Sequence, residues 1–312
     1  MTKSDTILVV IDPTANEHPV LDRATDVAGK FGARIELLIC DYQPHIVGAT
    51  FLDSKRLQTA KKNYLGKHLS HLEQLAQKGR GRGIDIRVKA TWDRPLYEGI
   101  IRQALECDAR YVFKDTHFHS AVSRALFSNT DWHLIQYCPA PLWLVRSGRD
   151  FERPSILASV DPLHEHDTTA ALDVRILSDA FELAGQLDGT VDVFHAYNPF
   201  EDPDDPGQPR AAHESALNAL AEQFQTGSGH VHLEAGNPVD LLPRMAADKP
   251  FDLVAMGAVS RSRLEHAIIG NTAENVLDHL PCDVLVIKPK GFVSPVTFKL
   301  QPRGYYCAEP DD

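Results

Sequence analysis

The chain repeats itself, and this repeat limits the possible folds more than any other feature. The segment ILVVIDPT at Ile7–Thr14 returns as ILASVDPL at Ile156–Leu163, a shift of 149 residues. The segment SNTDWHLIQYCPAPLWLVR, which starts at Ser128, lies over GNTAENVLDHLPCDVLVIKP, which starts at Gly270, a shift of 142 residues. Two copies of one structural unit are therefore expected.

Each copy alternates short apolar runs with segments of helical spacing. Runs such as YVFK, LWLVR, DLVAMG and VLVIKP are continuous rather than alternating, which is typical of a parallel sheet covered on both faces by helices. The sequence thus predicts an α/β fold with two tandem doubly wound domains, each a five-stranded, mainly parallel sheet flanked by helices. We place the first domain at 1–148 and the second at 153–290. Residues 291–312 form a C-terminal extension, either laid across the surface or disordered.

Composition narrows the possible partners. The 312 residues include 32 Lys and Arg against 43 Asp and Glu, a formal net charge of -11, so nucleic acid and anionic membranes are not expected partners. No stretch approaches the ~18 apolar residues of a membrane span, and the N-terminus lacks a signal-peptide pattern. We expect a cytoplasmic protein. A long amphipathic segment around Leu57, Leu65 and Leu72 is interpreted as a helix covering the sheet, with a membrane-surface helix as the alternative.

The sequence contains no common catalytic motif. G-x-S-x-G, G-x-x-x-x-G-K-[ST], H-E-x-x-H and a G-x-G-x-x-G after a strand are all missing from it. His230 and His232 would share one face of a strand, but no third ligand follows at a spacing typical of a metal site. We therefore predict no metal, no catalytic residue and no enzyme activity. Five scattered cysteines indicate free thiols rather than disulfides.

The Asp-Pro pair after the first strand of each copy and the segment MGAVSRSRLEHAIIGNTAENVLDHLPCDVLVIKP resemble the universal stress protein family in its tandem form. This resemblance implies that the two copies pack as a pseudo-dimer within one chain, with a homodimer as a further possibility. It also implies a cytoplasmic stress-response protein that supports resistance to stress and DNA-damaging agents.

Nucleotide-binding members of that family carry a loop of the form G-x2-G-x9-G-[ST]. In the second copy Gly257, Ser260, Gly270 and Asn271 stand at these positions. The Cβ of Ser260 hinders close approach of a phosphate, and Asn271 with Glu274 resembles a helix cap that competes with one. With the Asp after the first strand, the resemblance implies these candidate nucleotide contacts: Asp161, Gly257, Ser260, Gly270, Asn271 and Thr272.

The first copy is more degenerate at the same positions. Asp115, Phe118, Ser128 and Asn129 replace the loop residues, and no glycine remains, so nucleotide binding is not expected there. Asp12, the Asp of the first Asp-Pro pair, is either a ligand contact or part of an ordinary turn. The candidate cleft residues of this domain are Asp12, Asp115, Phe118 and Asn129. The nearby aromatic residues either pack in the core or line an apolar cleft; they are Phe113, Phe118, Phe127, Trp132 and Trp143.

Three hypotheses about function remain open. The first is a non-enzymatic binding and interaction protein of the stress response that needs no cofactor. The alternative is an ATP-binding protein that uses the loop of the second domain, with at most slow hydrolysis. The second alternative is binding of an apolar or lipid ligand in the cleft of the first domain.

Overall fold

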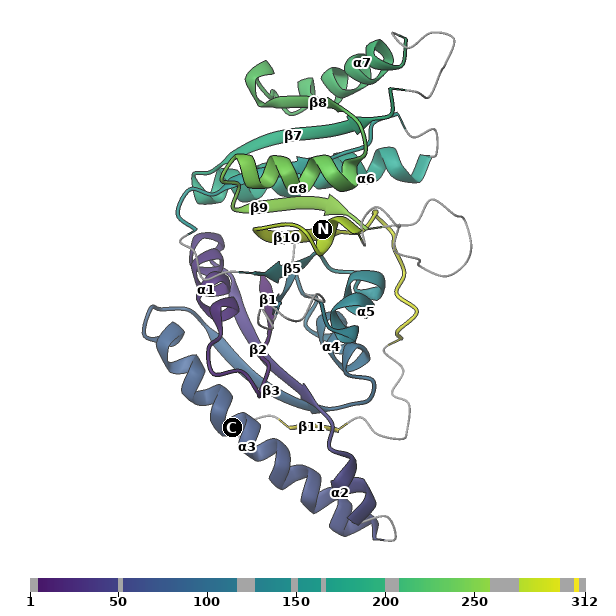
Figure 1. The fold of residues 1–312 in the computed structure, drawn as a ribbon. Helices are drawn as coiled ribbons and strands as arrows, with labels where there is room; N and C mark the ends of the chain where they lie inside the picture. The colour runs from purple at the N-terminus through teal and green to yellow at the C-terminus, as the bar shows by residue number, and fades with distance from the viewer. Residues whose placement is uncertain are drawn as a thin grey trace. The chain divides into compact units, whose positions relative to one another are not determined.

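The computed structural model describes residues 5–49, 53–116, 127–146, 151–163, 167–199, 208–258, 275–297 and 306–308. These residues belong to two compact units, one formed by Met1–Thr116, Ser128–Ala140 and Ser294–Asp312, the other by His117–Phe127 and Pro141–Val293. Both units consist of a mostly parallel sheet flanked by helices, which confirms the predicted α/β class (Figure 1).

The first unit has the strand order β11-β3-β2-β1-β4. Its elements are β1 (Thr6–Val10), α1 (Pro19–Phe31), β2 (Arg34–Asp41), α2 (Pro44–Ala49), α3 (Ser54–Arg80), β3 (Ile86–Trp92), α4 (Leu96–Glu106), β4 (Tyr111–Asp115), α5 (Asn129–Tyr137) and β11 (Tyr306–Ala308). Strands β3, β2, β1 and β4 are parallel, and β11 pairs antiparallel with β3. Helices α1 and α3 lie on one face of the sheet, and α4 and α5 on the other (Figure 1).

The second unit has the strand order β5-β10-β9-β6-β7-β8. Its elements are β5 (Leu142–Val145), β6 (Ser155–Ser159), α6 (Asp167–Leu187), β7 (Thr190–Tyr197), α7 (Gln208–Glu222), the 3₁₀ turn η1 (Ser228–His230), β8 (Val231–Ala235), α8 (Pro238–Asp248), β9 (Leu253–Gly257) and β10 (Asp283–Ile287). All strand pairs are parallel except β5 with β10.

Strand β5 ends the first sequence copy, yet it pairs with β10, the last strand of the second copy. The carboxylate of Asp283 in β10 fixes this pairing: Oδ2 accepts the indole N–H of Trp143 at 3.1 Å, and Oδ1 accepts the amide N–H of Arg146 at 2.9 Å. Both Asp283 and Trp143 are buried, so the bond between them is shielded from water. The domain boundaries at 148, 153 and 290 describe the sequence copies and stay a prediction.

The C-terminal extension contributes a strand that the sequence did not indicate. Tyr306, Cys307 and Ala308 pair with Trp92, Thr91 and Ala90 of β3, which otherwise ends the parallel part of the first sheet. An unpaired edge strand offers free backbone groups to other chains, and β11 covers part of this edge.

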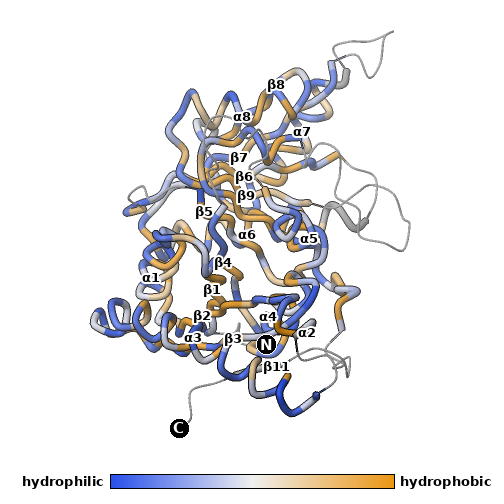
Figure 2. The backbone as a smooth tube through the Cα atoms, turned by 60° about the horizontal axis from the view of Figure 1, so that its bottom comes forward, coloured by the Kyte–Doolittle hydropathy of each residue, from blue (hydrophilic) through white to orange (hydrophobic). Residues whose placement is uncertain are grey.

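The core of each unit is made of the apolar runs identified in the sequence. Figure 2 shows hydrophobic stretches along the strands, and β1 and β10 are buried over their whole length. Helix α1 ends at Gly32, which adopts φ 62°, a left-handed conformation that glycine reaches at low cost. Helix α3 packs on β3 through Leu65, next to the buried Trp92, which supports its interpretation as a covering helix.

Helix α7 begins at Gln208, within the acidic, proline-rich stretch 198–214 of the sequence. Pro209 is the second residue of this helix, where the missing N–H of proline has no intrahelical partner to lose. None of the described helices is long and apolar enough to cross a membrane.

Candidate functional site

The carboxyl ends of the parallel strands are the usual ligand edge of such a sheet. In the second unit, β6 leads into Asp161 and β9 ends at Gly257, two of the six candidate nucleotide contacts. The other four, Ser260, Gly270, Asn271 and Thr272, lie outside the described residues. The site is therefore built from the groups that surround Asp161 and the start of the loop.

Gly257 is required by packing. A Cβ added there would lie 2.6 Å from Cδ2 and 3.3 Å from Cγ of Leu172 in α6. Helix α6 therefore packs so closely on the end of β9 that a side chain at this position would force Leu172 to move. This glycine has a structural reason that is independent of any phosphate.

Asp161 and Asp173 form a pair of carboxyl groups at this edge. The amide N–H of Asp161 donates to Oδ1 of Asp173 at 3.2 Å, while the Asp161 side chain is 38% exposed. Asp173 is buried, and no group among the described residues hydrogen-bonds its Oδ2. Burial raises the pKa of Asp173 to about 7; the amide bond from Asp161 opposes this shift, and the Asp161 charge adds to it. Near neutral pH Asp173 can therefore serve as a hydrogen-bond donor.

Two buried histidines extend the same site toward α7. His195 Nδ1 lies 3.0 Å from the carbonyl oxygen of Val160, and His195 Nε2 lies 2.8 Å from Nδ1 of His213. A carbonyl only accepts, so the proton of His195 sits on Nδ1, and Nε2 accepts the proton of His213. The Nδ1 atom of His195 also lies 3.9 Å from Oδ1 of Asp161.

Lys288 places a buried positive charge at the start of the loop. Its side chain is 2% exposed, and Nζ donates to the carbonyl oxygen of Ala258 at 2.6 Å. The ammonium also lies 5.2 Å from the ring centroid of Phe292. A buried cation is costly unless bonded, so its position next to the loop is well defined.

Sequence reasoning missed Asp173, His195 and Lys288. The sequence offered a signal only for Lys288. This lysine directly follows the apolar run VLVI, and such a run predicts that it is buried. The other two come from α6 and β7, and only the fold brings them to Asp161.

In the first unit, the position equivalent to Gly257 is occupied by a carboxylate. Asp115 is 6% exposed, and its Oδ1 accepts the amide N–H of Val20, the second residue of α1, at 2.9 Å. The N-terminus of a helix attracts anions through free N–H groups and its positive dipole end. Here the anion is a side chain of the protein itself, which supports the expectation of no nucleotide in this domain.

The remaining candidates of the first unit have structural roles. Oδ1 of Asp12 accepts the N–H and the hydroxyl of Thr14 at 2.7 and 2.6 Å, as in an ordinary Asx turn. Asn129 is the first residue of α5, whose N-cap is Ser128 in a capping box with Asp131. Phe118 lies outside the described residues.

The aromatic residues considered for an apolar cleft are mostly core residues. Phe113, Phe127 and Trp143 are buried, and Trp132 is partly exposed. Trp143 is an edge-to-face neighbour of Phe151, with ring centroids 5.4 Å apart. These contacts support the core interpretation.

His230 and His232 share a partner, as their spacing predicts, but it is a carboxylate. His230 Nδ1 and His232 Nε2 each lie 2.6 Å from one oxygen of Asp192 on β7. Although burial raises the pKa of Asp192, these two hydrogen bonds lower it below its ordinary value. Within the described ranges, no group of three His, Cys, Asp or Glu residues is arranged to hold a metal ion.

Comparisons with known proteins agree with this architecture. The model of the universal stress protein family matches residues 3–146 and 167–288, and thus both copies. Universal stress protein E of Escherichia coli is 30% identical over 308 residues, which cover 95% of this chain and 98% of that protein. Universal stress protein E of Photorhabdus laumondii is 29% identical over 309 residues, with the same coverage.

Solved structures give the same result. A functionally unknown protein from Pseudomonas aeruginosa matches with a TM-score of 0.74 and 28% identity, covering 92% of this chain and 93% of that one. A universal stress protein from Archaeoglobus fulgidus matches with a TM-score of 0.66 at 18% identity, covering 92% of this chain and 99% of that one, and shows the fold alone. The tandem arrangement is thus similar to that of universal stress protein E, and the chain belongs to the universal stress protein family.

Proposed function

We propose that this protein is a non-enzymatic, cytoplasmic stress-response protein that supports resistance to stress and DNA-damaging agents by binding partners. The observation that carries this proposal is the Asp115 carboxylate at the N-terminus of α1. In the first copy this carboxyl group stands where the family loop begins with a glycine, and it caps the N-terminus of α1.

His195 and His213 bond to each other, and His195 also bonds to the Val160 carbonyl. Their bonding is that of a structural pair that joins β7 to α7.

The pairing of β5 with β10 supports the pseudo-dimer proposal, because these are the last strands of the two sequence copies. In a protein with a single copy, the edge of this last strand would be open to pair with a second chain; here the last strand of the other copy pairs with it.

ATP binding in the second unit is the second candidate function. It is favoured by the Lys288 ammonium, which lies at the entry of the loop, and by Asp161 at the same edge of the sheet. Lysine commonly binds phosphate as a point charge. If Lys288 exchanged its bond to the Ala258 carbonyl for one to a phosphate oxygen, its hydrogen bond would become stronger, because both partners would then be charged.

Calorimetric titration with ATP separates the two candidates. The first predicts no saturable heat at millimolar ATP for the whole chain. The second predicts one binding event, which is lost in Gly270→Asp and weakened in Lys288→Gln, while the matched variant Lys249→Gln, at an exposed lysine of the same unit, retains it. Circular dichroism confirms that each variant is folded.

The apolar-ligand alternative has a separate test. Mass spectrometry of an organic extract of the purified protein would reveal a lipid at stoichiometric amount. We expect none, because Phe113 and Trp143 are fully buried.

A further inference from the structure

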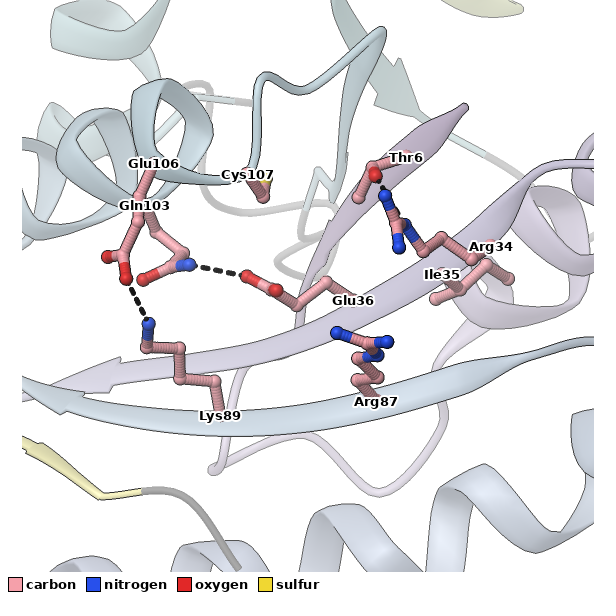
Figure 3. Close-up of a pocket in the computed structure, with 9 residues that line it drawn as sticks. All are labelled: Thr6, Arg34, Ile35, Glu36, Arg87, Lys89, Gln103, Glu106 and Cys107. Atoms are coloured by element: carbon pink, nitrogen blue, oxygen red, sulfur yellow. Dashed lines mark hydrogen bonds and ion pairs between the residues drawn. The ribbon is translucent and has the colours of Figure 1, made fainter. Parts of the chain in front are cut away.

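The first unit contains a pocket at the amino ends of its strands, whereas Asp12 and Asp115 lie at the carboxyl ends of the same sheet. The pocket is lined by Thr6 at the start of β1, Arg34–Glu36 in β2, Arg87 and Lys89 in β3, and Gln103, Glu106 and Cys107 at the end of α4 (Figure 3). Its cavity measures about 300 Å³, room for a small metabolite.

The pocket departs from the apolar pattern of a parallel sheet. On the sheet face that is turned toward α4, strands β2 and β3 carry charged side chains. Lys89 is buried and its Nζ lies 2.9 Å from Oε1 of Glu106. Gln103 Nε2 donates to Oε1 of Glu36 at 2.5 Å. Burial of such groups costs free energy relative to an apolar contact, and this kind of departure concentrates at functional sites.

Two arginines give the pocket its unbalanced charge. Arg34 uses Nε to bond the hydroxyl of Thr6 at 2.8 Å, which leaves its terminal amino groups available. Arg87 is exposed, and neither arginine has a carboxylate partner among the described residues. Figure 3 shows both guanidinium groups on the side of the pocket opposite Gln103 and Glu106. Guanidinium forks bind carboxylates and phosphates with paired hydrogen bonds.

Gln103 supplies a second, independent indication. Its side chain is 1% exposed, and its Oε1 has no hydrogen-bond partner among the described residues. The amide cannot be turned around, because Nε2 must face the Glu36 carboxylate. A buried acceptor without a partner costs free energy, so this polar residue is kept beside the pocket at a cost to stability.

We propose that this pocket binds a small anion, a phosphate ester or a hydroxy acid, with its anionic group at Arg34 and Arg87. The lining carries three cations and two carboxylates, so one negative group of a ligand would balance its charge. The excess of positive charge is local, because the whole chain has a net charge of -11.

Calorimetric titration of the full chain with glycerol 3-phosphate and with malate tests this site. We expect saturable binding of at least one of them and none of glycerol, which lacks the anion. Arg87→Gln and Arg34→Gln should each weaken binding about tenfold or more. Arg87→Lys, which keeps the charge but loses the fork, should fall between them and the wild type.

Two controls make the outcome specific. Arg56→Gln, at an exposed arginine of α3 away from the pocket, should change the affinity less than about twofold. Lys249→Gln, at an exposed lysine of the other unit, should leave the affinity unchanged. The proposal is overturned if neither anion binds saturably up to about 10 mM, or if binding persists unchanged in both Arg34→Gln and Arg87→Gln.

Discussion

Replacement of Asp283 by alanine tests how the last strands of the two sequence copies are joined. The side chain accepts two hydrogen bonds across the β5–β10 pair, from the Trp143 indole and the Arg146 amide. Each donor left without an acceptor costs about 1–3 kcal/mol, so we expect Asp283→Ala to lower the free energy of unfolding by about 2–6 kcal/mol. Asp283→Asn keeps one carbonyl oxygen and should lose about half as much.

Urea unfolding followed by circular dichroism and tryptophan fluorescence measures these differences, with the midpoint compared at constant m-value. The matched control is Asp248→Ala, because Asp248 is 69% exposed and pairs only with Arg244 of its own helix. It should stay within about 0.5 kcal/mol of the wild type. An Asp283→Ala protein as stable as this control would refute the pairing described here.

Three further predictions concern other parts of the chain. Gly257→Ala should cost about 1–3 kcal/mol through its contact with Leu172, and a double-mutant cycle with Leu172→Ala should show coupling rather than additive losses. The pKa of Asp173 is raised to about 7 in the folded protein, so the wild type loses stability as the pH rises from the pKa of an unfolded Asp toward 7. Asp173→Asn does not titrate, so in urea titrations its free energy of unfolding should rise by on the order of 2–4 kcal/mol relative to wild type between pH 4 and pH 8. A stability difference that does not vary with pH would contradict this assignment. Deletion of residues 298–312 removes β11 and should cause concentration-dependent self-association through β3 in analytical ultracentrifugation, whereas deletion of residues 309–312 should not.

The sequence was sufficient to predict the repeated α/β architecture. Continuous apolar runs identify strands covered on both faces, and spacing by three and four identifies helices such as α1. The direction of pairing is not contained in these runs. LWLV would pack as well beside a parallel neighbour, and the bonds that Asp283 accepts across its antiparallel pairing come from residues about 140 positions away in the sequence.

The candidate site was predicted only in part for the same reason. Asp161 and Gly257 carry recognisable local patterns, whereas His195 lies on β7, Asp173 on α6 and Lys288 directly after β10. Strand β11 was missed because three residues have no periodicity, and their pairing depends on the open edge of β3.

Release of inorganic phosphate from ATP decides whether this protein acts by binding alone, as we propose. A colorimetric phosphate assay with the purified chain, millimolar ATP and Mg²⁺ should show no release above the protein-free control over several hours. Release that scales with protein concentration and disappears in Lys288→Gln, but not in Lys249→Gln, would instead show that the second unit hydrolyses ATP.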